Sequence, residues 1–186
     1  MAPHLEICQP PKAPMNNPLF DLSGRVALIT GGSKGLGKAM ARAFAEAGAN
    51  IVISSRHPAE LEPALAEILA GTSARGKWFE ADMTRRQDVD RLASAALDAM
   101  GRVDILVNNA GSNVPQAVDE IHDADWDRIV ELNLTSCMRL TRAIVPQMKQ
   151  RNWGRIIHIS SVMGLTSKPG RSSYSATRSE EHTSEL

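Results

Sequence analysis

Short apolar runs alternate with amphipathic helical patterns along this chain, and that alternation restricts the possible folds more than any other feature. The apolar runs, each of strand length, cover residues 26–29, 51–53, 77–81, 103–107 and 155–159. Helical stripes separate them over residues 36–47, 58–70, 86–100 and 126–150. Strands that alternate with helices form parallel sheets, and right-handed crossovers place helices on both faces. The sequence therefore predicts an α/β fold with a doubly wound parallel sheet.

The longest helical pattern, residues 126–150, is expected to form one amphipathic helix. Its stripe at helical spacing consists of Val130, Leu134, Cys137, Met138, Thr141, Ile144, Val145 and Met148. A single stripe of this kind predicts one continuous helix with one buried face.

The length of 186 residues allows one domain with a hydrophobic core but not comfortably two. Residues 1–19 are rich in proline and lack periodicity, so we expect a flexible leader there. The domain itself is expected to cover residues 20–177.

Composition excludes several classes of function. Lys plus Arg and Asp plus Glu both number 21, so there is neither a basic arm for nucleic acid nor an acidic tail. No apolar run approaches the roughly 18 residues of a membrane span, and the first residues do not resemble a secretory signal. Cys8 and Cys137 lie far apart, which argues against a disulfide scaffold and a metal site. We therefore expect a cytoplasmic protein without nucleic-acid or membrane partners.

The first apolar run leads into a glycine-rich turn, residues 30–37, which opens the first helix. Glycines make such a turn tight and let backbone N–H groups approach a pyrophosphate, while the helix N-terminus adds about half a positive charge. A glycine turn by itself is a weak signal, because such a turn can also serve simple packing. Its position between a strand and a helix predicts a nucleotide site.

Three segments together resemble the short-chain dehydrogenase/reductase family over residues 22–177. They are the spacing Gly31-x-x-x-Gly35-x-Gly37 after a threonine, the run Asn108-Asn109-Ala110-Gly111, and Ser161 thirteen positions before Tyr174. The resemblance implies a Rossmann fold that binds a nicotinamide dinucleotide. It also implies a homo-oligomer, because the long helix and the helix near Tyr174 commonly pair subunits in this family.

The resemblance implies a set of cofactor-binding residues in four segments. Asp82 would bind the adenine amine, and the backbone from Asn109 to Gly111 would line the ribose side. The full set is Gly31, Ser33, Lys34, Gly35, Leu36, Gly37, Ser55, Arg56, Asp82, Met83, Asn109, Ala110 and Gly111.

The end of the second strand predicts which nicotinamide cofactor is used. NAD-selective proteins place a carboxylate there for the ribose 2′-OH, but this chain reads Ser54-Ser55-Arg56. Arg56 can pair with a 2′-phosphate, and Lys34 could add a second positive charge. The sequence therefore predicts NADP, with NAD possible. The alternative is that both side chains are solvated surface charges.

Hydride transfer to a ketone requires a proton donor and a neutral hydrogen-bond partner for the substrate oxygen. Tyr174 is the only tyrosine in the chain, and a free phenol titrates near pH ~10, so a cation is needed beside it. By resemblance, Tyr174 is the acid/base, Ser161 bonds the substrate oxygen, and Asn133 holds a water for proton relay. The predicted reaction interconverts a secondary alcohol and a ketone. The histidines at 57, 122 and 158 are interpreted as structural.

The carboxyl end departs from the family pattern. The family has Tyr-x-x-x-Lys, and the matching position here is Arg178, a planar cation that replaces a point charge poorly in a proton relay. The segment 178–186 lacks an apolar stripe and matches the translation of a widely used sequencing adapter. We hypothesise that these residues are an artefact and that one edge of the sheet is left open, which predicts poor solubility and little activity. Resequencing the source DNA across codon 177 tests this.

Two other functions remain open: a nucleotide-binding module without turnover, and an oligomer component that acts through protein contacts. Ser161, Tyr174 and Asn133 together favour the enzyme, whereas the missing lysine favours the binding module if Arg178 is authentic. The substrate cannot be read from the sequence. Residues 20–56 resemble members that act on sugar acids and also acyl-carrier ketoreductases.

Overall fold

The structure is a computed structural model that describes residues 18–179. Nearly all of the expected leader 1–19 and of the tail 178–186 lies outside the described residues. The main elements are β1 (Val26–Thr30), α1 (Gly35–Glu46), β2 (Asn50–Ser55), α2 (Pro58–Leu69), β3 (Gly76–Glu80), α3 (Arg86–Met100), β4 (Ile105–Asn108), α4 (Asp123–Val130), α5 (Ser136–Gln150), β5 (Arg155–His158) and α6 (Ser172–Arg178). A π-helical turn, Glu131–Thr135, joins α4 to α5.

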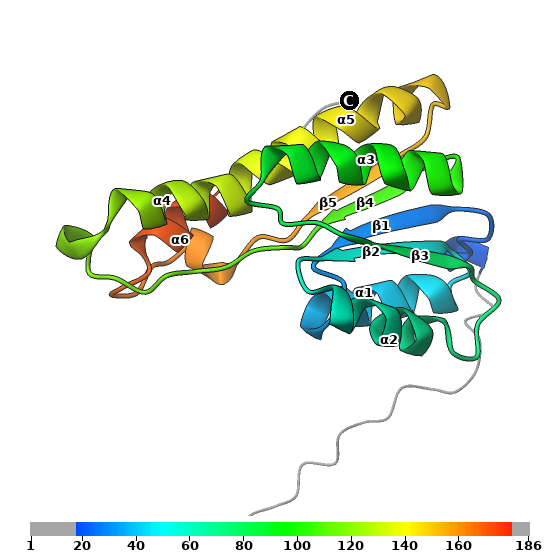
Figure 1. The fold of residues 1–186 in the computed structure, drawn as a ribbon, viewed down its shortest axis with the longest axis horizontal. Coiled ribbons are helices and arrows are strands. Elements are labelled where there is room, and N and C mark those ends of the chain that lie inside the picture. The colour runs from blue at the N-terminus through cyan, green and yellow to red at the C-terminus, as the bar shows by residue number, and fades with distance from the viewer. Residues whose placement is uncertain (1–17, 180–186) are drawn as a thin grey trace, which may run out of the picture.

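The strands form one parallel sheet in the order β3-β2-β1-β4-β5. The chain therefore places β2 and β3 on one side of β1, and then returns to place β4 and β5 on the other side of β1. Leu28 of β1 is in register with Val52 of β2 and with Leu106 of β4. Helices α1 and α2 lie on one face and α3 and α5 on the other (Figure 1). The predicted doubly wound α/β fold is confirmed.

Alternate residues of each inner strand enter two separate cores, as the period of two in a strand requires. Ala27 and Ile29 of β1 pack with α1 and α2, whereas Val26 and Leu28 pack with α3 and α5. All four side chains are buried because helices cover both faces.

The two outer strands are less buried than the inner ones. Trp78 on β3 is 37% exposed, and Ile157 on β5 is 38% exposed. Within the described residues β5 pairs only with β4, so the sheet is open on the β5 side, as expected.

The structure is helical where residues 126–150 predicted it and ends at Gln150 as expected, but the helical segment begins three residues earlier and contains a π-helical turn that was not predicted. Helix α4 begins at Asp123, where Asp123 and Asp125 place negative charge in the first turn. The π-helical turn from Glu131 to Thr135 then separates α4 from α5. A π turn inserts one extra residue into a helix, often at a functional site, and apolar periodicity does not reveal it.

The predicted stripe on this helix is also partly wrong. Leu134 and Met138 belong to the predicted stripe but are 38% and 49% exposed. The buried side chains are Ile129, Leu132, Asn133, Ser136, Cys137, Leu140, Ile144 and Met148. Apolar residues occur on both sides of the helix here, so periodicity alone does not select the side that packs on the sheet and α3.

A cluster of partly exposed arginines around one buried carboxylate holds the amino ends of the strands together, opposite the site described below. Asp104 is 0% exposed, and its carboxylate accepts the backbone N–H of Val26 at 2.9 Å. Arg102 donates to both carboxylate oxygens, from Nε at 2.7 Å and from Nη2 at 2.5 Å. Arg25 and Arg151 lie 3.8 Å and 3.5 Å from the same carboxylate. This cluster ties the start of β1 to the segment before β4.

No helix in the described part of the chain is both long enough and apolar enough to cross a membrane.

Candidate functional site

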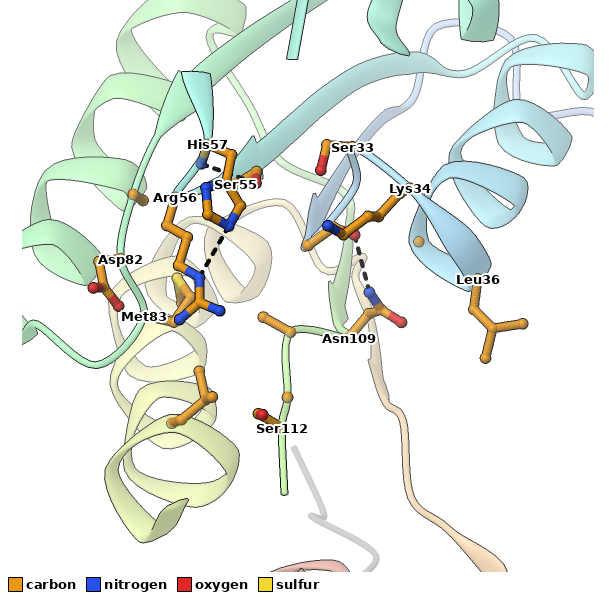
Figure 2. A pocket seen from close by; sticks show the side chains of 16 residues that line it. Ser33, Lys34, Leu36, Ser55, Arg56, His57, Asp82, Met83, Asn109 and Ser112 are labelled. Carbon is orange, nitrogen blue, oxygen red and sulfur yellow. Dashed lines mark hydrogen bonds between the residues drawn. The ribbon is translucent and has the colours of Figure 1, made fainter. Parts of the chain in front are cut away.

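The loops that follow β1, β2, β3 and β4 meet at the carboxyl edge of the sheet and enclose a cavity of about 360 Å³ (Figure 2). In open α/β sheets ligands bind at this edge, beside the point where the strand order reverses. The lining residues are Gly31, Ser33, Lys34, Leu36, Gly37, Ser55, Arg56, His57, Ala81, Asp82, Met83, Asn109, Ala110, Gly111, Ser112 and Leu132.

The glycine turn forms one wall of the cavity and passes directly into α1. Gly37 packs so closely on the turn that a Cβ atom there would lie 2.3 Å from the carbonyl oxygen of Gly31 and 2.6 Å from Nδ2 of Asn109. Only glycine fits such a contact with backbone. The first turn of α1, with its unpaired N–H groups and positive end of the dipole, is thereby held at the cavity.

Thr30 fastens this turn to the loop after β4. Its Oγ1 accepts the backbone N–H groups of Asn109 and Ala110, each at 3.0 Å. In return the Asn109 side chain donates from Nδ2 to the carbonyl oxygens of Thr30 at 2.9 Å and Gly31 at 3.3 Å. Two segments far apart in sequence therefore form one rigid wall.

A corner of the cavity carries several charges. Arg56, exposed after β2, donates from Nε to Nε2 of His57 at 3.3 Å. Glu60, in the first turn of α2, accepts the Ser33 hydroxyl at 2.8 Å and lies 3.4 Å from Nζ of Lys34. Donation from Ser33, followed by the charges of Lys34 and His57, holds the pKa of the Glu60 carboxyl below its usual range despite its partial desolvation. Glu60 is therefore ionised at neutral pH.

Asp82 follows β3 and lines the cavity on the side opposite Lys34 (Figure 2). Burial acts to raise the pKa of its carboxyl, but donation from the backbone N–H and hydroxyl of Thr84 and the charges of Arg56 and Arg85 lower it below the usual range. The Thr84 bonds are 2.9 Å and 2.8 Å long and both reach the same carboxylate oxygen. The carboxylate remains a fixed acceptor at the cavity.

Asn133, in the π-helical turn, links the cavity wall to α6. Its side chain accepts from the backbone N–H of Ser112 at 3.0 Å and donates to the carbonyl oxygen of Ser112 at 2.9 Å. The same Nδ2 donates to Oγ1 of Thr177 at 3.0 Å, and that hydroxyl donates to the carbonyl oxygen of Tyr174 at 2.9 Å. The amide of Asn133 thus positions both the loop after β4 and the helix that carries Tyr174.

The remaining predicted catalytic residues lie beyond β5. The Ser161 hydroxyl accepts the backbone N–H of Met163 at 3.2 Å. Tyr174 is half-buried on α6, and Cζ of Arg178 lies 5.5 Å from the centroid of its ring. Arg178 is buried and donates from Nη1 to the carbonyl oxygen of Ile159, and its Nη2 occupies the space that a side chain at Gly111 would take. A cation therefore lies beside the phenol.

The structure brings together the predicted cofactor-binding residues, all of which line the cavity except Gly35. Asn133, Ser161 and Tyr174 do not line it, and among the described residues no hydrogen bond joins the Ser161 and Tyr174 side chains. The lining residues missed by sequence reasoning are His57, Ala81, Ser112 and Leu132. The sequence alone favours a structural role for His57, although its place directly after Arg56 is a usable signal. No cluster of potential metal ligands occurs in residues 18–179.

Comparison with known proteins decides the family. The model of the family described as "short chain dehydrogenase" matches residues 25–179. The chain belongs to the short-chain dehydrogenase family. Nodulation protein G of Rhizobium sp. (strain N33) is 41% identical over 160 residues, which make up 86% of this chain and 64% of that protein. A D-beta-hydroxybutyrate dehydrogenase of Cupriavidus necator is 39% identical over 158 residues, 84% of this chain and 60% of that protein.

The fold of this short-chain dehydrogenase also matches solved structures. A metagenomic short-chain oxidoreductase in complex with NADP has a TM-score of 0.81 and 33% sequence identity, over 85% of this chain and 72% of that one. The chain spans 60–64% of the length of the two curated relatives named above.

Proposed function

We propose that the protein is an NADP-dependent oxidoreductase that interconverts a secondary alcohol and a ketone. The observation that carries this proposal is the cavity formed by the glycine turn, Arg56, Asp82 and the loop after β4, with Tyr174 on α6 beyond β5. The family and the NADP complex of a similar structure support it.

The residues of the cavity fit a dinucleotide. The close contact at Gly37 leaves the backbone of the turn free to cradle a pyrophosphate at the start of α1. Asp82 offers a fixed acceptor for the adenine amine, and Arg56 with Lys34 offers positive charge for a 2′-phosphate. When bound, the cofactor supplies or accepts the hydride.

The protein's own part in the reaction is the movement of a proton. We assign the acid/base role to the Tyr174 phenol and the bond to the substrate oxygen to the Ser161 hydroxyl. Asn133 positions Tyr174 through Thr177. We also assign to Asn133 the binding of a water molecule that relays the proton.

Replacing Arg56 with Gln is expected to weaken binding of NADP by roughly 10–100-fold, because one or two charge-assisted hydrogen bonds to the 2′-phosphate are lost. Binding of NAD should change little, since it carries a hydroxyl at that position. Titration calorimetry with both cofactors measures this. Arg75→Gln removes an exposed arginine beside the start of β3, away from the cavity, and serves as the control. Equal loss of both cofactors would count against the 2′-phosphate role.

In the protein completed from the intact gene, replacing Tyr174 with Phe is expected to lower turnover by roughly 10²–10⁴-fold while NADPH binding is retained, because only the transferable proton is removed. NADPH oxidation with a panel of ketones, followed by absorbance, measures the rate. Calorimetry on the same samples measures binding. Turnover by the Phe variant at the original rate would remove Tyr174 from the mechanism.

A second candidate function is a nucleotide-binding module without turnover. The buried Arg178 favours it. Its planar guanidinium donates to the Ile159 carbonyl oxygen, at the position where the family has the mobile ammonium group of a lysine. NADPH binding with no turnover on any ketone would support this alternative. The same reasoning supports the proposal that the 186-residue chain itself has little dehydrogenase activity.

We propose a leader over residues 1–19, a Rossmann domain over 20–177 and an artefactual tail over 178–186. A homo-oligomer through the outer face of α4 and α5 is supported by exposed apolar side chains there: Trp126, Leu134 and Met138.

For the substrate, the oxidoreductases with similar sequences suggest a hydroxyacid or 3-oxoacyl compound.

A further inference from the structure

An acidic side chain occupies the donors at one corner of the cavity. Glu60 accepts the hydroxyl of Ser33 and pairs with Lys34, and both of these residues line the cavity. Sequence reasoning found no acid at the end of β2, because Glu60 lies four residues after Arg56 and reaches the turn through the packing of α2 beside α1. The charge of this corner is therefore less positive than Lys34 and Arg56 alone would make it.

We propose that Glu60 is a specificity-determining residue that weakens selection for the cofactor bearing a 2′-phosphate and so lets the site accept NAD as well as NADP. This inference rests on the proposed function, because it concerns the same cofactor cavity.

Two physical effects support the proposal. First, the Ser33 hydroxyl has one proton to donate, and Glu60 already accepts it, so a phosphate oxygen must displace the carboxylate. Second, the carboxylate repels a phosphate that shares Lys34 as a counterion. A neutral 2′-hydroxyl meets neither obstacle. Because the corner is open to solvent, screening limits the repulsion, and about tenfold in affinity is the size expected.

The substitution Glu60→Gln separates charge from structure. Gln keeps a side-chain oxygen that can accept the Ser33 hydroxyl, but it carries no charge. The matched control is Glu62→Gln, which removes the same charge from an exposed position two residues further along α2. If Glu60 acted only on α2 or on the turn, Glu60→Gln would change the affinity for every adenine nucleotide by the same factor.

The test uses the full chain and two half-cofactors, 2′,5′-ADP and 5′-AMP, which differ in the 2′-phosphate and need no substrate or turnover. Calorimetry is expected to show that Glu60→Gln binds 2′,5′-ADP about tenfold more tightly than the unchanged protein, with 5′-AMP unaltered. Glu62→Gln should leave the ratio of the two affinities as it is.

An unchanged ratio in Glu60→Gln, or the same change in Glu62→Gln, would overturn the inference while the proposed cofactor site stands. Failure of both nucleotides to bind any of the proteins, each shown to be folded by its melting transition, would overturn the proposed function and this inference with it.

Discussion

Replacing Asp104 with Asn is expected to lower the free energy of unfolding by about 3 kcal/mol. The carboxylate is wholly buried and accepts the Val26 N–H and two donors of Arg102. An amide places an NH₂ group where one of these donors points, so at least one buried hydrogen bond is replaced by two opposed donors. Three arginines then lose their common counterion.

Thermal unfolding measured by circular dichroism checks this expectation. A loss of about 3 kcal/mol corresponds to a fall in Tm of roughly 6–12 °C for a domain of this size. The control is Asp90→Asn, because Asp90 is exposed and its pair with Arg139 is worth less than about 1 kcal/mol. Equal and small shifts in both variants would show that the Asp104 cluster does not hold the strand ends.

The alternation of strands and helices was enough to predict the fold class, because a buried parallel strand and an amphipathic helix have different patterns of apolar residues in the sequence. Val26–Thr30 and Asn50–Ser55 are strands where the apolar runs predicted them. The order of strands across the sheet does not follow from that alternation. Adjacency depends on which helix covers which face, and that is decided by packing between segments distant in sequence.

The interruption at Glu131–Thr135 shows where periodicity fails. Asn133 has its place in the π-helical turn through bonds to Ser112 and Thr177, which lie 21 and 44 residues away in sequence. These bonds are made by the side chain to residues distant in sequence, and nothing in the local sequence records them. The resemblance to the family pointed to Asn133, but the residues of the segment did not reveal its contacts.

Sequence reasoning located the backbone that lines the cavity better than it located the charges around the cavity. Motifs at strand ends locate the glycine turn and the segment Asn109–Gly111, because the carboxyl ends of parallel strands converge. Glu60 and His57 were missed as parts of the site because they belong to the start of α2 or the residue before it. A prediction that considers only the residues at the strand ends therefore overestimates the positive charge of the cavity.

Replacing Gly37 with Ala is expected to abolish most cofactor binding, with a loss of roughly 10²-fold or more in affinity, because hydrogen bonds from the turn to a charged group are lost. The new Cβ would lie 2.3 Å from the Gly31 carbonyl oxygen, and reaching an allowed contact of 3.0 Å requires the turn and α1 to separate by roughly 0.7 Å. The Asn109 side chain, which ties the turn to the loop after β4, is displaced at the same time. The amides that would hold the pyrophosphate then lose their common geometry, and the overpacked turn destabilises the fold by about 1–3 kcal/mol.

The matched control for this substitution is Gly71→Ala. Gly71 has a positive φ of 71° and open space around it, so an added methyl group produces backbone strain without a clash. That strain costs about 1–2 kcal/mol in stability, similar to the cost at Gly37, but it lies outside the cavity. Calorimetry with NADPH and thermal unfolding of both variants therefore separate general destabilisation from damage to the turn. Full NADPH affinity in Gly37→Ala would mean that the turn does not bind the cofactor, because no arrangement of this backbone accommodates the methyl group without moving the amides.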